Sequence, residues 1–180
     1  MSRGFTIPEL LVVIFIMSFM SGLVLVNWRA GERGLALDRA AHKLGQDVRR
    51  AQELAMRAQP FACAAGSISG YGVFFSQDMP ESYSLFAECN GNNAYNDGTD
   101  GLVETVSLEP GISIQDVFPA LPAVKRGSVV FLPPMPVIAV TSGTASPIVR
   151  TQMAVVLQRA DDSSLTRRVT ITNKGIIDID

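Results

Sequence analysis

The feature that most constrains this chain of 180 residues is an apolar run from Leu10 to Val26, close to the N-terminus. Its 17 residues include no charged side chain, and Ser18, Ser21 and Gly22 are its only interruptions. As a helix with a rise of ~1.5 Å per residue, the run would be about 26 Å long. The hydrocarbon core of a bilayer is roughly 30 Å thick. The run therefore predicts a membrane-spanning helix.

The residues on either side of the run narrow its interpretation. Glu9 comes directly before it, and a carboxylate costs on the order of 2.5–3.5 kcal/mol at the centre of a membrane helix, so we expect Glu9 to have a partner or a function. A secretory signal peptide could use Arg3 as its basic region, but it needs a small-residue cleavage site after the apolar run. Asn27-Trp28-Arg29 follows instead. A plain membrane anchor explains the run but gives no reason for Glu9.

The order of residues in this segment is specific: a basic residue, then Gly, Phe, and after three more residues Glu and an apolar helix. The stretch Gly4–Ile14 in that order resembles the leader of type IV pilins and pseudopilins. The resemblance implies that a prepilin peptidase cleaves between Gly4 and Phe5 and that Phe5 is then N-methylated. Glu9 would neutralise the new amino terminus, either its own or that of a neighbouring subunit. The apolar helix would stay on the mature protein and later pack in a filament, where Ser18, Ser21 and Gly22 allow close helix approach.

Orientation in the membrane does not follow from charge alone, because Arg3 stands on one side of the apolar run and Arg29 and Arg33 on the other. The resemblance places Arg3 in the cytoplasm. We therefore expect a single-pass protein of the bacterial cytoplasmic (inner) membrane with its head outside the cytoplasm. It would later move into a cell-surface or periplasmic filament.

A second helical pattern follows the apolar run and ends near Gln59, just before Pro60. Apolar residues recur at i, i+3 and i+4 spacing, while oppositely charged side chains four residues apart occupy the other face. An amphipathic helix of this kind needs an apolar partner, and a sheet from the rest of the chain is the natural one. The apolar positions are Leu37, Ala40, Ala41, Leu44, Val48, Ala51, Leu54, Ala55 and Ala58.

The remainder of the chain predicts a β-rich head. Short β-like runs alternate with Gly, Pro, Asn, Asp or Ser. Asn173-Lys174-Gly175 predicts a hairpin, and tight local connections favour antiparallel pairing. The class is α+β, divided into a leader (1–4), a membrane or filament-core helix (5–27), an amphipathic helix (28–59) and the head (60–180). The predicted strands are Phe61–Ala65, Tyr71–Phe75, Tyr83–Glu88, Leu102–Leu108, Ser128–Leu132, Val137–Val140, Gln152–Gln158, Arg167–Thr172 and Ile176–Ile179.

Two segments of the head extend the resemblance. Gly70-Tyr71-Gly72-Val73-Phe74-Phe75 and the closing stretch from Arg168 to Ile176 resemble the head of GspH/FimT-type minor pseudopilins. The middle of the chain offers no comparable match. The resemblance therefore implies the pilin superfamily through the N-terminus and this subfamily through the two head segments.

Cysteine, histidine and acidic side chains are the candidates for chemistry. Cys63 and Cys89 are the only cysteines, and they predict either a disulfide in an oxidising compartment or two buried thiols. The only histidine, His42, falls on the polar face of the amphipathic helix, where a solvated side chain is the expected state. Neither a zinc site nor a catalytic base is indicated.

An acidic stretch without Lys or Arg runs from Ala58 to Val124. It includes a loop, Asn90–Gly101, that is dense in oxygen ligands of the kind calcium prefers, with Asp97, Asp100 and Glu104 as the charged candidates. The spacing is not that of an EF-hand, and Asn, Gly and Asp are also common in solvated turns. A solvated loop is the ordinary interpretation and calcium the alternative. No other cofactor is expected.

Together these patterns predict a structural subunit rather than an enzyme. The subunit would be a minor pilin or pseudopilin of a type IV pilus or a type II secretion pseudopilus. Its partners would be other subunits, prepilin peptidase and an inner-membrane assembly platform, with no small-molecule substrate. The alternative is a FimT-like DNA-binding minor pilin. Arg167 and Arg168 would serve it, but residues 60–180 have a net charge of −5, with seven Lys and Arg against twelve Asp and Glu. Nucleic acid is therefore not an expected ligand.

Overall fold

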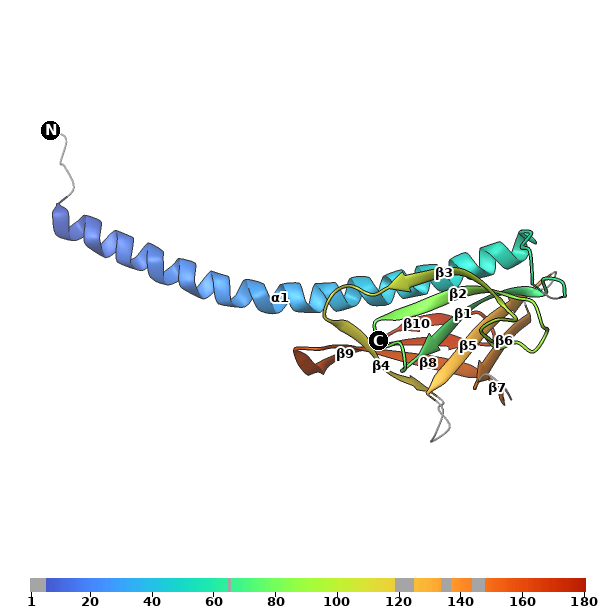
Figure 1. Cartoon of the computed structure of the whole chain (residues 1–180). Helices are drawn as coiled ribbons and strands as arrows, with labels where there is room; N and C mark the ends of the chain where they lie inside the picture. The colour runs from blue at the N-terminus through green and yellow to red at the C-terminus, as the bar shows by residue number, and fades with distance from the viewer. Residues whose placement is uncertain (1–5, 65, 119–124, 134–136, 144–147) are drawn as a thin grey trace. The chain divides into compact units, whose positions relative to one another are not determined.

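The computed structural model describes residues 6–64, 66–118, 125–133, 137–143 and 148–180, and for residues 24–33 it describes the backbone alone. Over these residues the chain forms a long helix, α1 (Ile7–Met56), followed by the strands β1 to β10 (Figure 1). The chain divides into two compact units, residues 1–36 and 37–180. The first part of α1 therefore belongs to one unit, and the rest of α1 belongs to the other together with all the strands.

From Ile7 to Leu23, within the first unit, α1 has an almost continuous apolar surface. From Ile7 to Leu23 its large apolar side chains are 40–79% exposed. Pro8 lies in the first turn, where its missing N–H removes no helix hydrogen bond. Over the residues whose side chains the structure describes, no helix has an apolar stretch long enough to cross a membrane.

The part of α1 in the second unit is amphipathic. Its helix ends at Met56, and the turn that follows is closed by hydrogen bonds from the Arg57 N–H to the Glu53 carbonyl and from the Gln59 N–H to the Leu54 carbonyl. The expected end near Gln59 is therefore close to the observed one. One side of this part is buried in the head and follows the predicted apolar spacing; its buried side chains are Leu37, Ala40, Ala41, Leu44, Val48, Ala51 and Ala55.

The larger of the two sheets contains six strands in the order β3-β2-β1-β5-β6-β7 (Figure 1). Neighbouring strands are antiparallel throughout. β1 is central and is buried along its whole length. The bounds are β1 (Gly70–Ser76), β2 (Ser82–Glu88), β3 (Gly101–Ser107), β5 (Arg126–Leu132), β6 (Val137–Ser142) and β7 (Ile148–Arg150).

The smaller sheet contains four antiparallel strands in the order β10-β9-β8-β4. Its bounds are β4 (Ile112–Phe118), β8 (Gln152–Arg159), β9 (Asp162–Thr172) and β10 (Ile177–Ile179). β9 and β10 form a hairpin in which Gly175 has φ of 81°. A glycine adopts this left-handed conformation without steric cost, which is why the predicted Asn173–Gly175 connection forms here.

The second part of α1 packs against both sheets. A Cβ added to Gly45 would lie 3.6 Å from the side chains of Ile177 and Ile179 on β10. On the larger sheet, the Tyr83 hydroxyl donates to Asp47 over 2.5 Å. Burial and this carboxylate together raise the pKa of Tyr83 far above its usual range, so the phenol stays neutral. The helix thus closes one side of a common apolar core.

The predicted α+β class, with a long N-terminal helix packed on an antiparallel β-rich head, is confirmed. Three details differ. Residues 61–64 of the predicted strand Phe61–Ala65 are not a strand, and residue 65 lies outside the described residues. β4 and β7 were not predicted. The strands also form two sheets and not one. The chain leaves the larger sheet after β7, and β8 then pairs with β9 and β4 in the smaller sheet.

Candidate functional site

The N-terminal part of α1 is the first candidate site. Glu9 lies in the first turn, is exposed, and accepts a 3.5 Å hydrogen bond from the Thr6 hydroxyl. It is the only ionisable side chain between Thr6 and Leu23. A Cβ added to Gly22 would meet no atom within 4 Å. The proposed cleavage and methylation positions, Gly4 and Phe5, lie outside the described residues. The described surface is therefore a long apolar face with one acid at its start.

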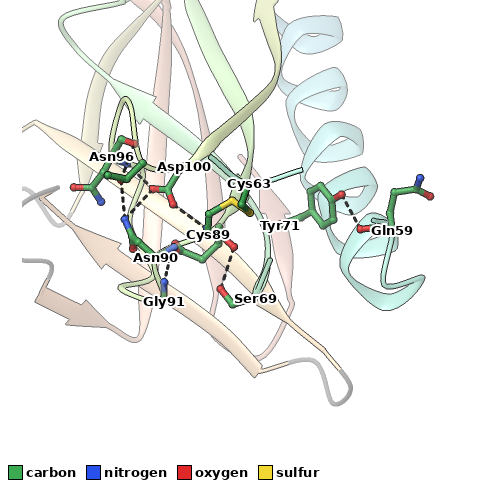
Figure 2. Close-up of a disulfide and its surroundings, with 11 residues drawn as sticks. Gln59, Cys63, Ser69, Tyr71, Cys89, Asn90, Gly91, Asn96 and Asp100 are labelled. Carbon is green, nitrogen blue, oxygen red and sulfur yellow. Dashed lines mark hydrogen bonds between the residues drawn. A yellow bond between two sulfur atoms is a disulfide. The ribbon is translucent and has the colours of Figure 1, made fainter. Parts of the chain in front are cut away.

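A disulfide between Cys63 and Cys89 is the second candidate, and Figure 2 shows it beside the polar loop. It joins the segment after α1 to the end of β2, and the Cα atoms are 5.8 Å apart. Nearby, Ser69 donates its backbone N–H and its hydroxyl to the Glu88 carbonyl, over 2.8 Å and 3.1 Å. The Tyr71 hydroxyl donates to the Gln59 carbonyl over 3.0 Å. These contacts hold Gln59, Cys63 and Ser69 against the sheet without a strand ladder, which explains the failed strand prediction there.

The polar loop after Cys89 uses its carboxylates for its own hydrogen bonds. Asp100 accepts from the backbone N–H of Cys89 over 2.9 Å and from that of Asn96 over 2.7 Å (Figure 2). Glu104 pairs with Arg50 of α1 at 2.7 Å, and Asp97 is exposed. Among the residues that the structure describes, no three His, Cys, Asp or Glu side chains are grouped to hold a metal ion. The structure does not bring the three calcium candidates, Asp97, Asp100 and Glu104, into one site.

Glu88 is a buried carboxylate that the sequence did not identify as a candidate. Its side chain is fully buried, and its Oε1 accepts from the backbone N–H of Gly91 at 2.8 Å and of Asn90 at 3.3 Å. Its Oε2 is buried without a hydrogen-bond partner among the described residues. Burial, with Asp100 nearby, raises the pKa of Glu88 above its ordinary value of 4.5. Its position at the end of a strand, before a Gly- and Asn-rich loop, is the only signal the sequence offers.

The histidine and one of the arginines proposed for DNA lie apart from any cluster. His42 is exposed on α1, as its place on the polar face indicated. Arg167 donates to Asp38 of α1 over 2.5 Å, so it connects β9 to the helix. Arg168 is exposed on the opposite side of β9. The two neighbouring arginines therefore do not form one basic patch.

Arg168 instead belongs to a cleft that sequence reasoning did not identify. Its guanidinium carbon lies 5.7 Å from the ring centroid of Phe118, at the end of β4. A cleft of about 470 Å³ is lined by these two residues together with Arg150, Thr151, Gln152 and Ala154. Arg150 comes from β7 of the larger sheet, whereas the other strands here belong to the smaller sheet. Phe118 and Arg168 lie far along the chain from residues 150–154, so no local motif could reveal the cleft.

Comparisons with known proteins give few matches. No protein-family model matches the chain, and no curated protein matches its sequence. Two crystal structures of the type IV minor pilin FimU of Pseudomonas aeruginosa strain PAO1 are similar to it. One has a TM-score of 0.45 and 11% identity over 80% of this chain and 87% of FimU. The other has a TM-score of 0.44 and 13% identity over 80% and 92%. At these scores the likeness carries no weight for function, which rests on the chain's own residues.

Proposed function

We propose that this chain is a structural filament subunit, a minor pilin or pseudopilin of a type IV pilus or a type II secretion pseudopilus. One observation carries the proposal. The leader-like sequence Arg3–Glu9 is followed directly by a helix whose apolar side chains, from Leu10 to Leu23, are exposed. Burying such an apolar face is favourable by roughly 25 cal/mol per Å². The membrane would bury this apolar face before assembly, and neighbouring subunits would bury it in the filament.

Glu9 has a specific role in this proposal. Cleavage between Gly4 and Phe5 creates a charged amine at the start of an apolar helix, and an unpaired charge in an apolar surrounding is expensive. Glu9 supplies the compensating charge to its own terminus or to that of a neighbour. Its exposure and its lack of an ion pair among the described residues leave it available for this contact.

The head supports a position outside the cytoplasm. A disulfide such as Cys63–Cys89 persists in oxidising compartments and is rare in the cytosol. The apolar helix would then hold the subunit in the inner membrane until assembly. Partners in this scheme are other subunits, prepilin peptidase and the inner-membrane assembly platform.

Intact-mass spectrometry of the membrane-extracted protein tests the processing step. We expect the mass of a chain that begins at N-methyl-Phe5, lower than that of the unprocessed chain by residues 1–4. Gly4→Leu should block cleavage by placing a bulky side chain at the scissile bond, while Ser2→Leu, two residues away, should be processed normally. A wild-type chain that begins downstream of Trp28, or one that keeps Met1 in a host with an active leader peptidase, would contradict the proposal.

A further inference from the structure

We infer that the cleft between Arg150, Arg168 and Phe118 binds a carboxylate-bearing extended segment of a neighbouring filament subunit. The inference rests on the proposed function, because it needs a neighbour whose head lies next to this one. It assigns a contact on the head in addition to the contact made by the apolar helix.

The charges on the head single out these two arginines. Within residues 60–180, Arg126, Arg159 and Arg167 each pair with a carboxylate: Asp78, Asp161 and Asp38. Arg150 and Arg168 have no carboxylate within ion-pair distance among the described residues. Arg150 donates only to the Ser142 hydroxyl, over 3.4 Å. The two arginines that the head leaves without an acid thus line the same cleft.

The strand pairing places Arg168 on the outer face of the smaller sheet, and its guanidinium lies over the Phe118 ring in the cleft. Within the smaller sheet, Arg168 of β9 pairs with Val156 of β8 on one side and exchanges backbone hydrogen bonds with Asp180 on the other. Its guanidinium extends across β8 to Phe118. Ala154, which pairs with Phe118, is small enough to leave that path open. The ring holds the planar guanidinium from one side, so its donors remain available to a planar anion.

The surroundings favour a single carboxylate over a long polyanion. Asp178 of β10 and Asp180, directly after β10, lie on the same face as Arg168, and the head has a net charge of −5. A nucleic acid strand that extended beyond the cleft would meet these negative charges. A carboxylate on a peptide needs only the cleft, where two guanidinium groups can bind it with paired hydrogen bonds.

The edge strands of the two sheets offer backbone groups with which the rest of such a segment can pair. β7 and β4 each have a strand partner on one side only, over the described part of the chain. Both end at the cleft, through Arg150 and Phe118. Val149, in the middle of β7, is 75% exposed. An extended peptide can pair with such an edge through its backbone and place alternate side chains on one face.

Photo-crosslinking in assembled filaments tests the inference. Gln152→benzoylphenylalanine places a photoreactive group on an exposed residue of the cleft, and mass spectrometry identifies the partner peptide. We expect a peptide of a neighbouring subunit with Asp or Glu at the crosslinked position. Arg150→Gln and Arg168→Gln together should lower the crosslinked fraction about tenfold, since charge-assisted bonds are lost. Arg159→Gln, which removes an arginine already paired with Asp161, should leave it unchanged.

Three other results separate the possible failures. If the chain is in the filaments but its crosslinks reach no acidic peptide, or do not depend on the arginines, the inference is wrong and the proposed function stands. If the chain is absent from the filaments, the proposed function fails and the inference fails with it. Retention of a single-stranded oligothymidine by the full chain in detergent, abolished by the double arginine change, would assign the cleft to nucleic acid and would also overturn the inference.

Discussion

The two parts of α1 have the same backbone structure and opposite relations to the rest of the protein. From Ile7 to Leu23, apart from Glu9 and two serines, the helix is apolar on every side and its large apolar side chains are exposed. From Leu37 to Met56 only one stripe is apolar, and the head covers it. A helix that is apolar on every side needs a surrounding of lipid or other helices, while an amphipathic one needs a single partner. Under the proposed function, the first part serves assembly, while the second part is packed into the head.

Substitutions of leucine in the two parts should differ most. Leu44→Ala removes a fully buried side chain, and we expect it to lower the free energy of unfolding of the head by about 3 kcal/mol. Leu11→Ala alters an exposed side chain and should leave that free energy unchanged. Pulse proteolysis of the full chain in mild detergent, across a urea series, measures both. Equal effects of the two substitutions would end the distinction between the two parts.

Removing the disulfide should have an effect of similar size, again confined to the head. Cys63→Ser with Cys89→Ser frees a loop of 26 residues, and loop entropy predicts a loss of about 3 kcal/mol in the free energy of unfolding. Membrane retention through the first part of α1 should be unaffected. If the doubly substituted chain matched the wild type in the urea series, the hydrogen bonds of Gln59 and Ser69 alone would be enough to hold this part of the chain to the sheet.

The pH dependence of the head should come in part from Glu88. Because its pKa is raised in the folded state, its contribution to stability is full below the unfolded pKa and is lost as the pH rises through the folded value. Glu88→Gln keeps an oxygen for the Gly91 and Asn90 N–H groups and removes the charge. Relative to the wild type, the free energy of unfolding of the variant should rise as the pH increases from below the unfolded pKa of glutamate to above its raised folded value. A constant difference across this range would show that Glu88 does not titrate with folding.

The smallest effect is expected from the ion pair that connects α1 to β9. Asp38→Asn breaks the pair with Arg167, and since both side chains are partly exposed, the loss should be below about 1 kcal/mol. Added salt should reduce the difference from the wild type. A loss as large as that of Leu44→Ala would mean that charge, and not apolar burial, holds the second part of α1 to the head.

Local patterns in the sequence predict most of the fold. The apolar spacing from Leu37 to Ala55 gives the buried stripe of α1, and alternating runs give most strands, because both depend on neighbouring residues. β4 was missed because a bulge near Gln115 interrupts its alternation of Ile112, Ile114 and Val117. β7 is only three residues long. The strand predicted from Phe61 fails because the ring of Phe61 packs on Gly101 and the disulfide fixes the backbone nearby.

The candidate sites were less accessible to sequence reasoning. The leader is a contiguous motif and could be recognised from Arg3 to Glu9. The cleft of Arg150, Arg168 and Phe118 joins residues from three strands in two sheets, so it exists only once the sheets have formed. The buried state of Glu88 likewise depends on the loop that folds over it. Contacts between residues that are distant in the sequence produce no local spacing pattern from which they could be predicted.

The most direct test of the central claim compares one acid from each part of α1 in assembled filaments. Glu9→Ala and Glu53→Ala each remove an exposed carboxylate from the same helix. Quantitative mass spectrometry of sheared filaments and of membranes gives the assembled and retained fractions. We predict that Glu9→Ala stays in the membrane but falls about tenfold in filaments, since a charged terminus loses its partner, while Glu53→Ala assembles normally. Wild-type incorporation of Glu9→Ala would contradict the account.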